Sequence, residues 1–225
     1  MPAHEQFVAS NEAYVSTFDK GALPMPPAKH YIVVTCMDAR VEPASQLGIG
    51  LGDAHVIRNA GGSAKEALRS IVVSQRLLGT REVAVFHHTD CGMLTFTNEE
   101  LREKVKAETP AASEIVGEID FLPISDLEDS VKTDVAFLKE SSLLLQDTVY
   151  TGWLYDVKTG KVRLFLLQYT GRILNKLFGS LDQTSRLNRK FLSRPGKELE
   201  NYLVRMNNHN TINIAFVRCT NFFLV

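Results

Sequence analysis

The sequence predicts an α/β fold with a mostly parallel central β-sheet, an antiparallel edge strand and flanking helices. Two observations carry this prediction. Short apolar segments rich in β-branched residues alternate with segments of helical spacing, and a turn signal separates the last two apolar segments. Strands that alternate with helices are typical of parallel sheets, because a crossover helix returns the chain to the same end of the sheet.

Three segments have the continuous apolar character of buried parallel strands. They are Tyr31–Cys36 (YIVVTC), 54–58 (AHVIR) and Glu82–His88 (EVAVFHH). Val149–Tyr155 and 161–165 flank Lys158-Thr159-Gly160, which is a hairpin signal. The hairpin predicts the antiparallel strand at the edge of the sheet.

The strongest helix signal covers residues 63–78, where the apolar residues share one broad face. Ser63 is placed to cap this helix, Glu66 follows three positions later, and Gly79 ends it. Weaker helix candidates are 11–18, 98–107 and 126–140. The segment 21–27 (GALPMPP) predicts a non-helical connection.

Composition is that of an ordinary globular protein, with 225 residues, 44% hydrophobic residues and a formal net charge of −1. This balance gives no indication of nucleic-acid binding, and no apolar run approaches the length of about 20 residues that a membrane span needs. The first 30 residues have no apolar signal core, so we expect a cytoplasmic protein. Three cysteines, Cys36, Cys91 and Cys219, do not describe a disulfide framework.

Charge divides the chain into two predicted parts, a catalytic domain over 1–163 and an atypical basic tail over 164–225. The tail has nine basic and three acidic residues, a net charge of +6, which leaves −7 for residues 1–163. One interpretation of the tail is an amphipathic surface helix. Its apolar positions would be Leu164, Phe165, Leu167, Ile173, Leu174, Leu177 and Phe178. The interpretation that we favour is a poorly structured segment.

Two short motifs follow two of the predicted parallel strands: Cys36-Met37-Asp38-Ala39-Arg40, and the run from His87 to Gly92 (HHTDCG). Ligands in open α/β sheets bind outside the carboxyl ends of the strands, so residues about 50 apart in sequence are expected to converge there.

Cys36, His88 and Cys91 form a candidate metal-ligand set, because zinc prefers thiolate sulfur and imidazole nitrogen. Taken one at a time, each is better explained as a core cysteine or a satisfied histidine. Together at two strand ends they favour the metal site. A fourth cysteine or histidine is missing nearby, and His87 should point to the opposite face of its strand. The site is therefore predicted to keep an open position, as catalytic zinc sites do.

Asp38 and Arg40 are two residues apart and lie on one side of an extended segment. The guanidinium would keep the carboxylate ionised and fix its orientation, so that Asp38 accepts a hydrogen bond from a water on the metal. The alternative is an ordinary surface ion pair. Gly61 and Gly62 follow a strand and allow close approach of backbone to a small substrate, or they form a plain strand-to-helix turn. The sequence does not decide between these two roles of the glycines.

These motifs and their context resemble the β-class carbonic anhydrases, in particular the small archaeal- and fungal-type branch. The resemblance is carried by CMDAR, LGIGLGDAHVIRNAGG, ALRSIVVSQRLLGT and EVAVFHHTDCGM, and it covers about residues 5–163. Plant-type members have a glutamine before the first cysteine that helps to bind bicarbonate. No glutamine occurs between residues 21 and 35 here.

The resemblance implies one Zn²⁺ per subunit on Cys36, His88 and Cys91, and a catalytic dyad of Asp38 and Arg40. It also implies interconversion of carbon dioxide and bicarbonate, and N-terminal helical arms that embrace a partner in a homodimer or a larger homo-oligomer. Two alternatives remain: hydrolysis of carbonyl sulfide or carbon disulfide at the same site, and a non-catalytic zinc- or bicarbonate-binding protein. A zinc dehydrogenase is disfavoured because no dinucleotide fingerprint accompanies the motifs.

Overall fold

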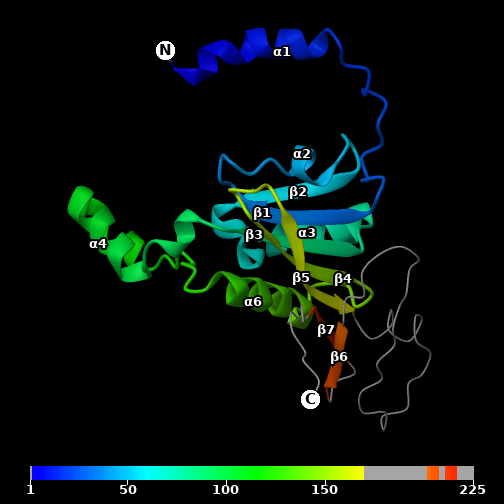
Figure 1. Ribbon diagram of the computed structural model, residues 1–225. Coiled ribbons are helices and arrows are strands. Elements are labelled where there is room, and N and C mark those ends of the chain that lie inside the picture. Colours follow the sequence, from blue (N-terminus) through cyan, green and yellow to red (C-terminus); the bar gives the residue numbers. More distant parts are fainter. Residues whose placement is uncertain (1, 170–201, 208–210, 217–225) are drawn as a thin grey trace.

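The computed structural model describes residues 2–169, 202–207 and 211–216. Its centre is a seven-stranded sheet with the strand order β2-β1-β3-β4-β5-β7-β6 (Figure 1). The strands are β1 (Tyr31–Cys36), β2 (Ala54–Asn59), β3 (Glu82–His88), β4 (Val149–Tyr155), β5 (Val162–Tyr169), β6 (Tyr202–Asn207) and β7 (Thr211–Phe216). The predicted α/β class and all five predicted strands are confirmed.

Strands β2, β1, β3 and β4 run parallel, so their carboxyl ends meet at one edge of the sheet. Cys36 pairs in register with Asn59 of β2, and His88 at the end of β3 pairs with Tyr155 of β4. Strand β5 returns antiparallel to β4, as the hairpin signal predicts. The parallel register therefore places the two predicted motifs at the same edge.

Six α-helices lie in the described part of the chain, four of them near the predicted ranges. They are α1 (Phe7–Val15), α2 (Pro43–Leu47), α3 (Ala64–Leu78), α4 (Asn98–Glu108), α5 (Ser113–Gly117) and α6 (Leu127–Glu140). Short 3₁₀ turns lie at Ala3–Gln6, Ala60–Gly62, Gly92–Leu94 and Pro110–Ala112. The first helix begins at Phe7, four residues before the predicted start, and the five-residue helices α2 and α5 were not predicted. Among the described residues, no helix is both long and apolar enough to cross a membrane.

Both faces of the central strands are buried, which explains their continuous apolar sequence. On one face, Val34 and Val85 pack in a core cluster with residues of α3 and α6. On the other face, Val33 and Phe86 form a second cluster, against which Leu47 of α2 packs. Alternate residues of one strand therefore pack on opposite faces of the sheet.

Helix α3 begins and ends where its sequence predicts. The Ser63 side chain accepts a hydrogen bond from the backbone N–H of Glu66, and Gly79 adopts a φ of 76° directly after the last turn. A serine cap satisfies one of the free amides of a helix start, and glycine adopts the left-handed conformation without steric cost. This fixed start places the turn before α3 against the ends of β1 and β3.

The C-terminal segment contributes to the sheet where it is described. Strand β5 crosses the predicted boundary at residue 163, and β7 pairs antiparallel with its outer side at Leu166, Leu167 and Gln168. Strands β6 and β7 were not predicted. The alternative interpretation of the tail, a helix that begins at Leu164, is wrong at its start, because the first of its apolar positions lie in β5. The positions from Ile173 to Phe178 lie outside the described residues, and the division of the chain at 163 stays a prediction.

Candidate metal centre

Strands β1 and β3 bring the side chains of Cys36, His88 and Cys91 together at the carboxyl edge of the sheet. One donor atom from each residue lies within 4.8 Å of the others, and all three residues are buried. The two sulfur atoms are 3.9 Å apart. A tetrahedral zinc with Zn–S bonds of about 2.3 Å requires a sulfur–sulfur distance of roughly 3.8 Å. The donor set and its spacing therefore fit a zinc ion.

His88 is held in the tautomer that a metal ligand needs. Its Nδ1 lies 2.9 Å from the backbone carbonyl of Thr89, which only accepts hydrogen bonds, so Nδ1 carries the proton. Nε2 then keeps its lone pair, is fully buried, and finds no hydrogen-bond partner among the described residues. Buried polar atoms are rarely left unpaired, and a metal ion at the Cys–His–Cys cluster would complete this one.

The backbone after β3 turns Cys91 back toward Cys36. The Thr89 N–H continues the ladder by donating to the Tyr155 carbonyl, and the next residue, Asp90, has a φ of 57°. Aspartate is one of the few residues that tolerate this left-handed conformation. The reversal at Asp90 allows two ligands three residues apart to reach one point.

Electrostatics between the two cysteines also match a cation site. A hydrogen bond from the Cys91 thiol, opposed by burial, lowers the pKa of Cys36 to about 4. The same contact and burial raise the pKa of Cys91, so the pair loses one proton readily and the second with difficulty. For His88, burial lowers the pKa, but the contacts with the Cys36 sulfur and the Thr89 carbonyl outweigh it and raise the pKa overall. A divalent cation favours loss of both thiol protons.

Asp38 and Arg40 form a bidentate pair beside the cluster. Arg40 donates from Nε to one carboxylate oxygen at 3.0 Å and from a terminal nitrogen to the other at 2.8 Å. Its backbone N–H adds a third bond at 2.8 Å. These bonds hold the pKa of the Asp38 carboxyl well below its usual range. Asp38 also lies 3.8 Å from Nε2 of His88. This distance is too long for a hydrogen bond between the two. The Asp38 carboxylate is therefore a hydrogen-bond acceptor beside the cluster.

Two residues that brace this pair were not singled out from the sequence. Arg40 also donates to the Asp90 side chain at 2.7 Å and to its backbone carbonyl at 2.9 Å. Arg58, near the end of β2, donates to the backbone carbonyls of Cys36 and Asp38. Asp90 lies inside the second motif, between His88 and Cys91, and this position is the sequence signal for its role. The role of Arg58 depends on the pairing of β2 with β1.

The two predicted glycines form the turn between β2 and α3, and both have a φ of 75°. A Cβ atom at Gly62 would lie 3.0 to 3.1 Å from backbone atoms of β1 and β3, so the turn lies flat against both strands. The backbone amide of Gly61 interacts with the Cys36 sulfur and is one of the causes that lower its pKa. The turn therefore borders the metal cluster, and contact of its backbone with a substrate stays a prediction.

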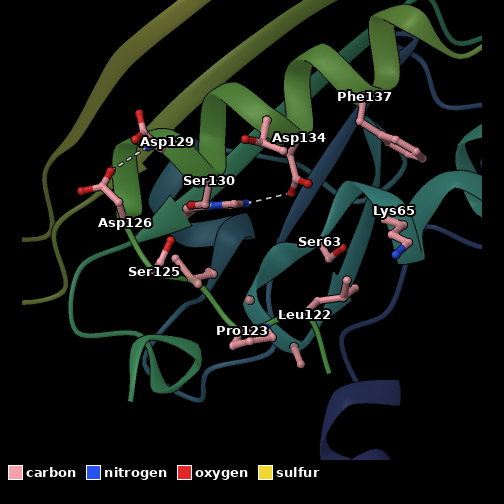
Figure 2. Close-up of a pocket in the computed structure, with 15 residues that line it drawn as sticks. Ser63, Lys65, Leu122, Pro123, Ser125, Asp126, Asp129, Ser130, Asp134 and Phe137 are labelled. Atoms are coloured by element: carbon pink, nitrogen blue, oxygen red, sulfur yellow. Dashed lines mark hydrogen bonds and ion pairs between the residues drawn. The ribbon is translucent and has the colours of Figure 1, made fainter. Parts of the chain in front are cut away.

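A cavity of about 380 Å³ lies next to this turn, between the start of α3 and helix α6 (Figure 2). Gly61 lines it, whereas none of the three candidate metal ligands does. His87 faces this cavity, as predicted from the alternation along β3. Its Nδ1 lies 2.6 Å from the Ser130 hydroxyl, and its Nε2 lies 3.1 Å from the Asp134 carboxylate. Adjacent histidines thus serve opposite faces of the strand.

Comparison with known proteins agrees with the geometry of the site. A sequence model described as carbonic anhydrase matches residues 31–162. β-Carbonic anhydrase 1 of Mycobacterium tuberculosis is 41% identical over 163 residues, which cover 72% of this chain and 97% of that protein. The solved carbonic anhydrase of Glaciozyma antarctica is 50% identical with a TM-score of 0.71, over 73% of this chain and 99% of that one. Carbon disulfide hydrolase of an Acidianus species is 34% identical over 160 residues, which cover 62% of this chain and 78% of that protein.

Proposed function

Because the chain belongs to the β-class carbonic anhydrase family, we propose that it catalyses the reversible hydration of carbon dioxide to bicarbonate and a proton. The observation that carries this proposal is the buried cluster of two sulfurs and one unpaired imidazole nitrogen within 4.8 Å. In this proposal Cys36, His88 and Cys91 hold one zinc ion per subunit. Zinc supplies a Lewis acid that makes water a nucleophile near neutral pH.

In this proposal each residue around the cluster has a separate role in the reaction. Asp38 is ionised, so it only accepts hydrogen bonds and orients a proton-bearing nucleophile next to His88. Arg40 holds both carboxylate oxygens of Asp38 and keeps that side chain from filling the open position of the cluster. In this proposal the backbone of Gly61 and Gly62 borders the place of a small linear substrate beside the cluster. Carbon dioxide and bicarbonate are the proposed substrate and product.

Carbon disulfide is a second candidate substrate, because relatives of 34% and 32% identity are named carbon disulfide hydrolase. Carbon disulfide and carbonyl sulfide are linear triatomic molecules like carbon dioxide, and the same ligands would serve all three. A non-catalytic zinc protein is disfavoured by the intact pair of Asp38 and Arg40. A homodimer also remains part of the proposal, supported by exposed apolar residues on α1, among them Phe7 and Val8. The cytoplasmic location stays a prediction.

The proposal is tested by metal analysis and stopped-flow carbon dioxide hydration on the full chain. We expect about one zinc per subunit, and hydration that is lost with a chelator and restored by zinc. Cys91→Ser should lose both zinc and activity, whereas Cys219→Ser, outside both motifs, should keep both. Parallel assays with carbon disulfide and carbonyl sulfide separate the candidate substrates. A zinc-loaded protein that hydrates carbon dioxide no faster than buffer would refute the proposed reaction.

A further inference from the structure

A single carboxylate on helix α6 contacts two segments that border the metal cluster. One oxygen of Asp134 lies 3.1 Å from Nε2 of His87 and accepts the backbone N–H of Ala64 at 2.9 Å. Figure 2 shows Asp134 and Ser130 extending from α6 into the cavity, with a dashed line from Asp134 to the neighbouring imidazole ring. These contacts join residues that are 47 and 70 positions apart in sequence.

The first contact fixes the end of strand β3. An ionised carboxylate only accepts hydrogen bonds, so Nε2 of His87 donates to Asp134. The other ring nitrogen faces the Ser130 hydroxyl at 2.6 Å, and the side chain of His87 is only 3% exposed. With both nitrogens held, the imidazole has one orientation. The peptide that joins His87 to the candidate ligand His88 is therefore held from the α6 side of the sheet.

The second contact fixes the turn that borders Cys36. Ala64 is the first residue of α3, and its N–H is one of the amides that lack a partner within the helix. A carboxylate is favourable at this position, because the amides of a helix start carry partial positive charge. Gly62, two residues earlier, lies against the backbones of β1 and β3. Asp134 thus anchors the chain three residues after Gly61, the glycine whose backbone amide interacts with the Cys36 sulfur.

Other charged groups around the cavity already have partners, which argues against a ligand site. Asp126 accepts from the backbone of Asp129, Asp129 pairs with Lys132, and Lys65 pairs with Asp120. Asp134 differs from these because its contacts reach the two segments that border the metal cluster. This wall of the cavity therefore supports the metal cluster structurally.

We infer that Asp134 is a positioning residue of the metal centre. It holds two segments in one arrangement: the end of β3 that carries His88, and the turn that borders Cys36. It acts through His87 and through the Ala64 amide. The inference deepens the proposed function. It rests on that function for one measurement, the kcat of carbon dioxide hydration. Residues that orient metal ligands typically change metal affinity or activity by about 10- to 100-fold when they are removed.

The test uses the full-length zinc protein and the variants Asp134→Ala and Asp129→Ala. For Asp134→Ala we expect zinc release to a chelator to be about tenfold faster, and the absorption spectrum of the cobalt-substituted protein to change. We also expect kcat to fall about tenfold, with KM nearly unchanged. Asp129 lies on the same helix and cavity but pairs with Lys132 at the surface, so its variant should match the parent protein in all readouts.

Asp134→Asn keeps the shape of the side chain and provides the test if the alanine variant does not fold. It should change zinc release and the cobalt spectrum in the same direction by a smaller amount, because a neutral amide oxygen accepts both bonds more weakly. Folded Asp134 variants with the zinc release and cobalt spectrum of the parent would overturn the inference. Both readouts are independent of substrate, so failure of carbon dioxide hydration alone would refute the proposed reaction and leave this inference standing.

Discussion

His87 and His88 are neighbours in one strand and both are buried, yet their surroundings differ in kind. His87 has a partner for each ring nitrogen, Ser130 on one side and Asp134 on the other. Within the described part of the chain, His88 has a partner for Nδ1 alone, and its Nε2 faces two sulfurs without a hydrogen bond. A histidine with both nitrogens paired supports the structure, whereas one with a single buried free nitrogen is equipped to bind a cation.

The largest effect is expected from removal of the free nitrogen. His88→Ala deletes one of three candidate ligands and leaves two cysteines, which is too few for a catalytic zinc site. We expect zinc content and carbon dioxide hydration to fall to background, as measured by metal analysis and stopped-flow kinetics. His55→Ala is a suitable control. His55 belongs to β2, contacts Ser74 of α3 and lies outside the cluster. Retention of zinc and activity in His88→Ala would remove the distinction between the two histidines.

A smaller effect is expected when the acceptor beside His88 is released. Arg40→Gln removes the bidentate partner of Asp38, whose carboxylate lies 3.8 Å from Nε2 of His88. Asp38 is then free to move into the open position of the cluster, so kcat should fall about 10- to 100-fold, while zinc stays bound. Kinetics and zinc content measured on the same samples check this. Arg69→Gln, an exposed change on α3, should leave both unchanged, and loss of zinc in Arg40→Gln would contradict the assigned role.

The smallest effect is expected on the His87 side. Ser130→Ala leaves a buried ring nitrogen of His87 without its partner, which costs about 1–3 kcal/mol of stability. Urea unfolding should show this loss, while zinc content and kcat change less than twofold, because Asp134 still holds the ring. A loss of zinc as large as in His88→Ala would show that Asp134 alone does not hold the His87 ring in place.

Local sequence predicted the parts of this protein whose stabilising contacts are local. The strands β1 and β3 are continuous apolar runs, and α3 has both of its caps in sequence, at Ser63 and Gly79. The convergence of Cys36, His88 and Cys91 followed from parallel strand ends and needed no knowledge of side-chain packing.

Contacts between distant segments were not predictable in this way. Asp134 meets His87 across 47 positions, and Arg58 reaches Asp38 only because β2 pairs with β1. Neither residue has a motif of its own. Strand β7 belongs to the sheet through pairing with β5, whose residues lie far earlier in the chain. Short α2 begins at a proline and is too brief to show an apolar period.

Helix α1 stands apart from the sheet in Figure 1, and none of its nine residues is buried. Phe7, Val8, Tyr14 and Val15 are each more than half exposed. Isolated helices of this length are marginal in water, since nucleation is costly and too few hydrogen bonds follow to offset it. In the proposed homodimer, formation of this helix would depend on contact with the neighbouring subunit, so folding of the arm and docking of that subunit would be one event.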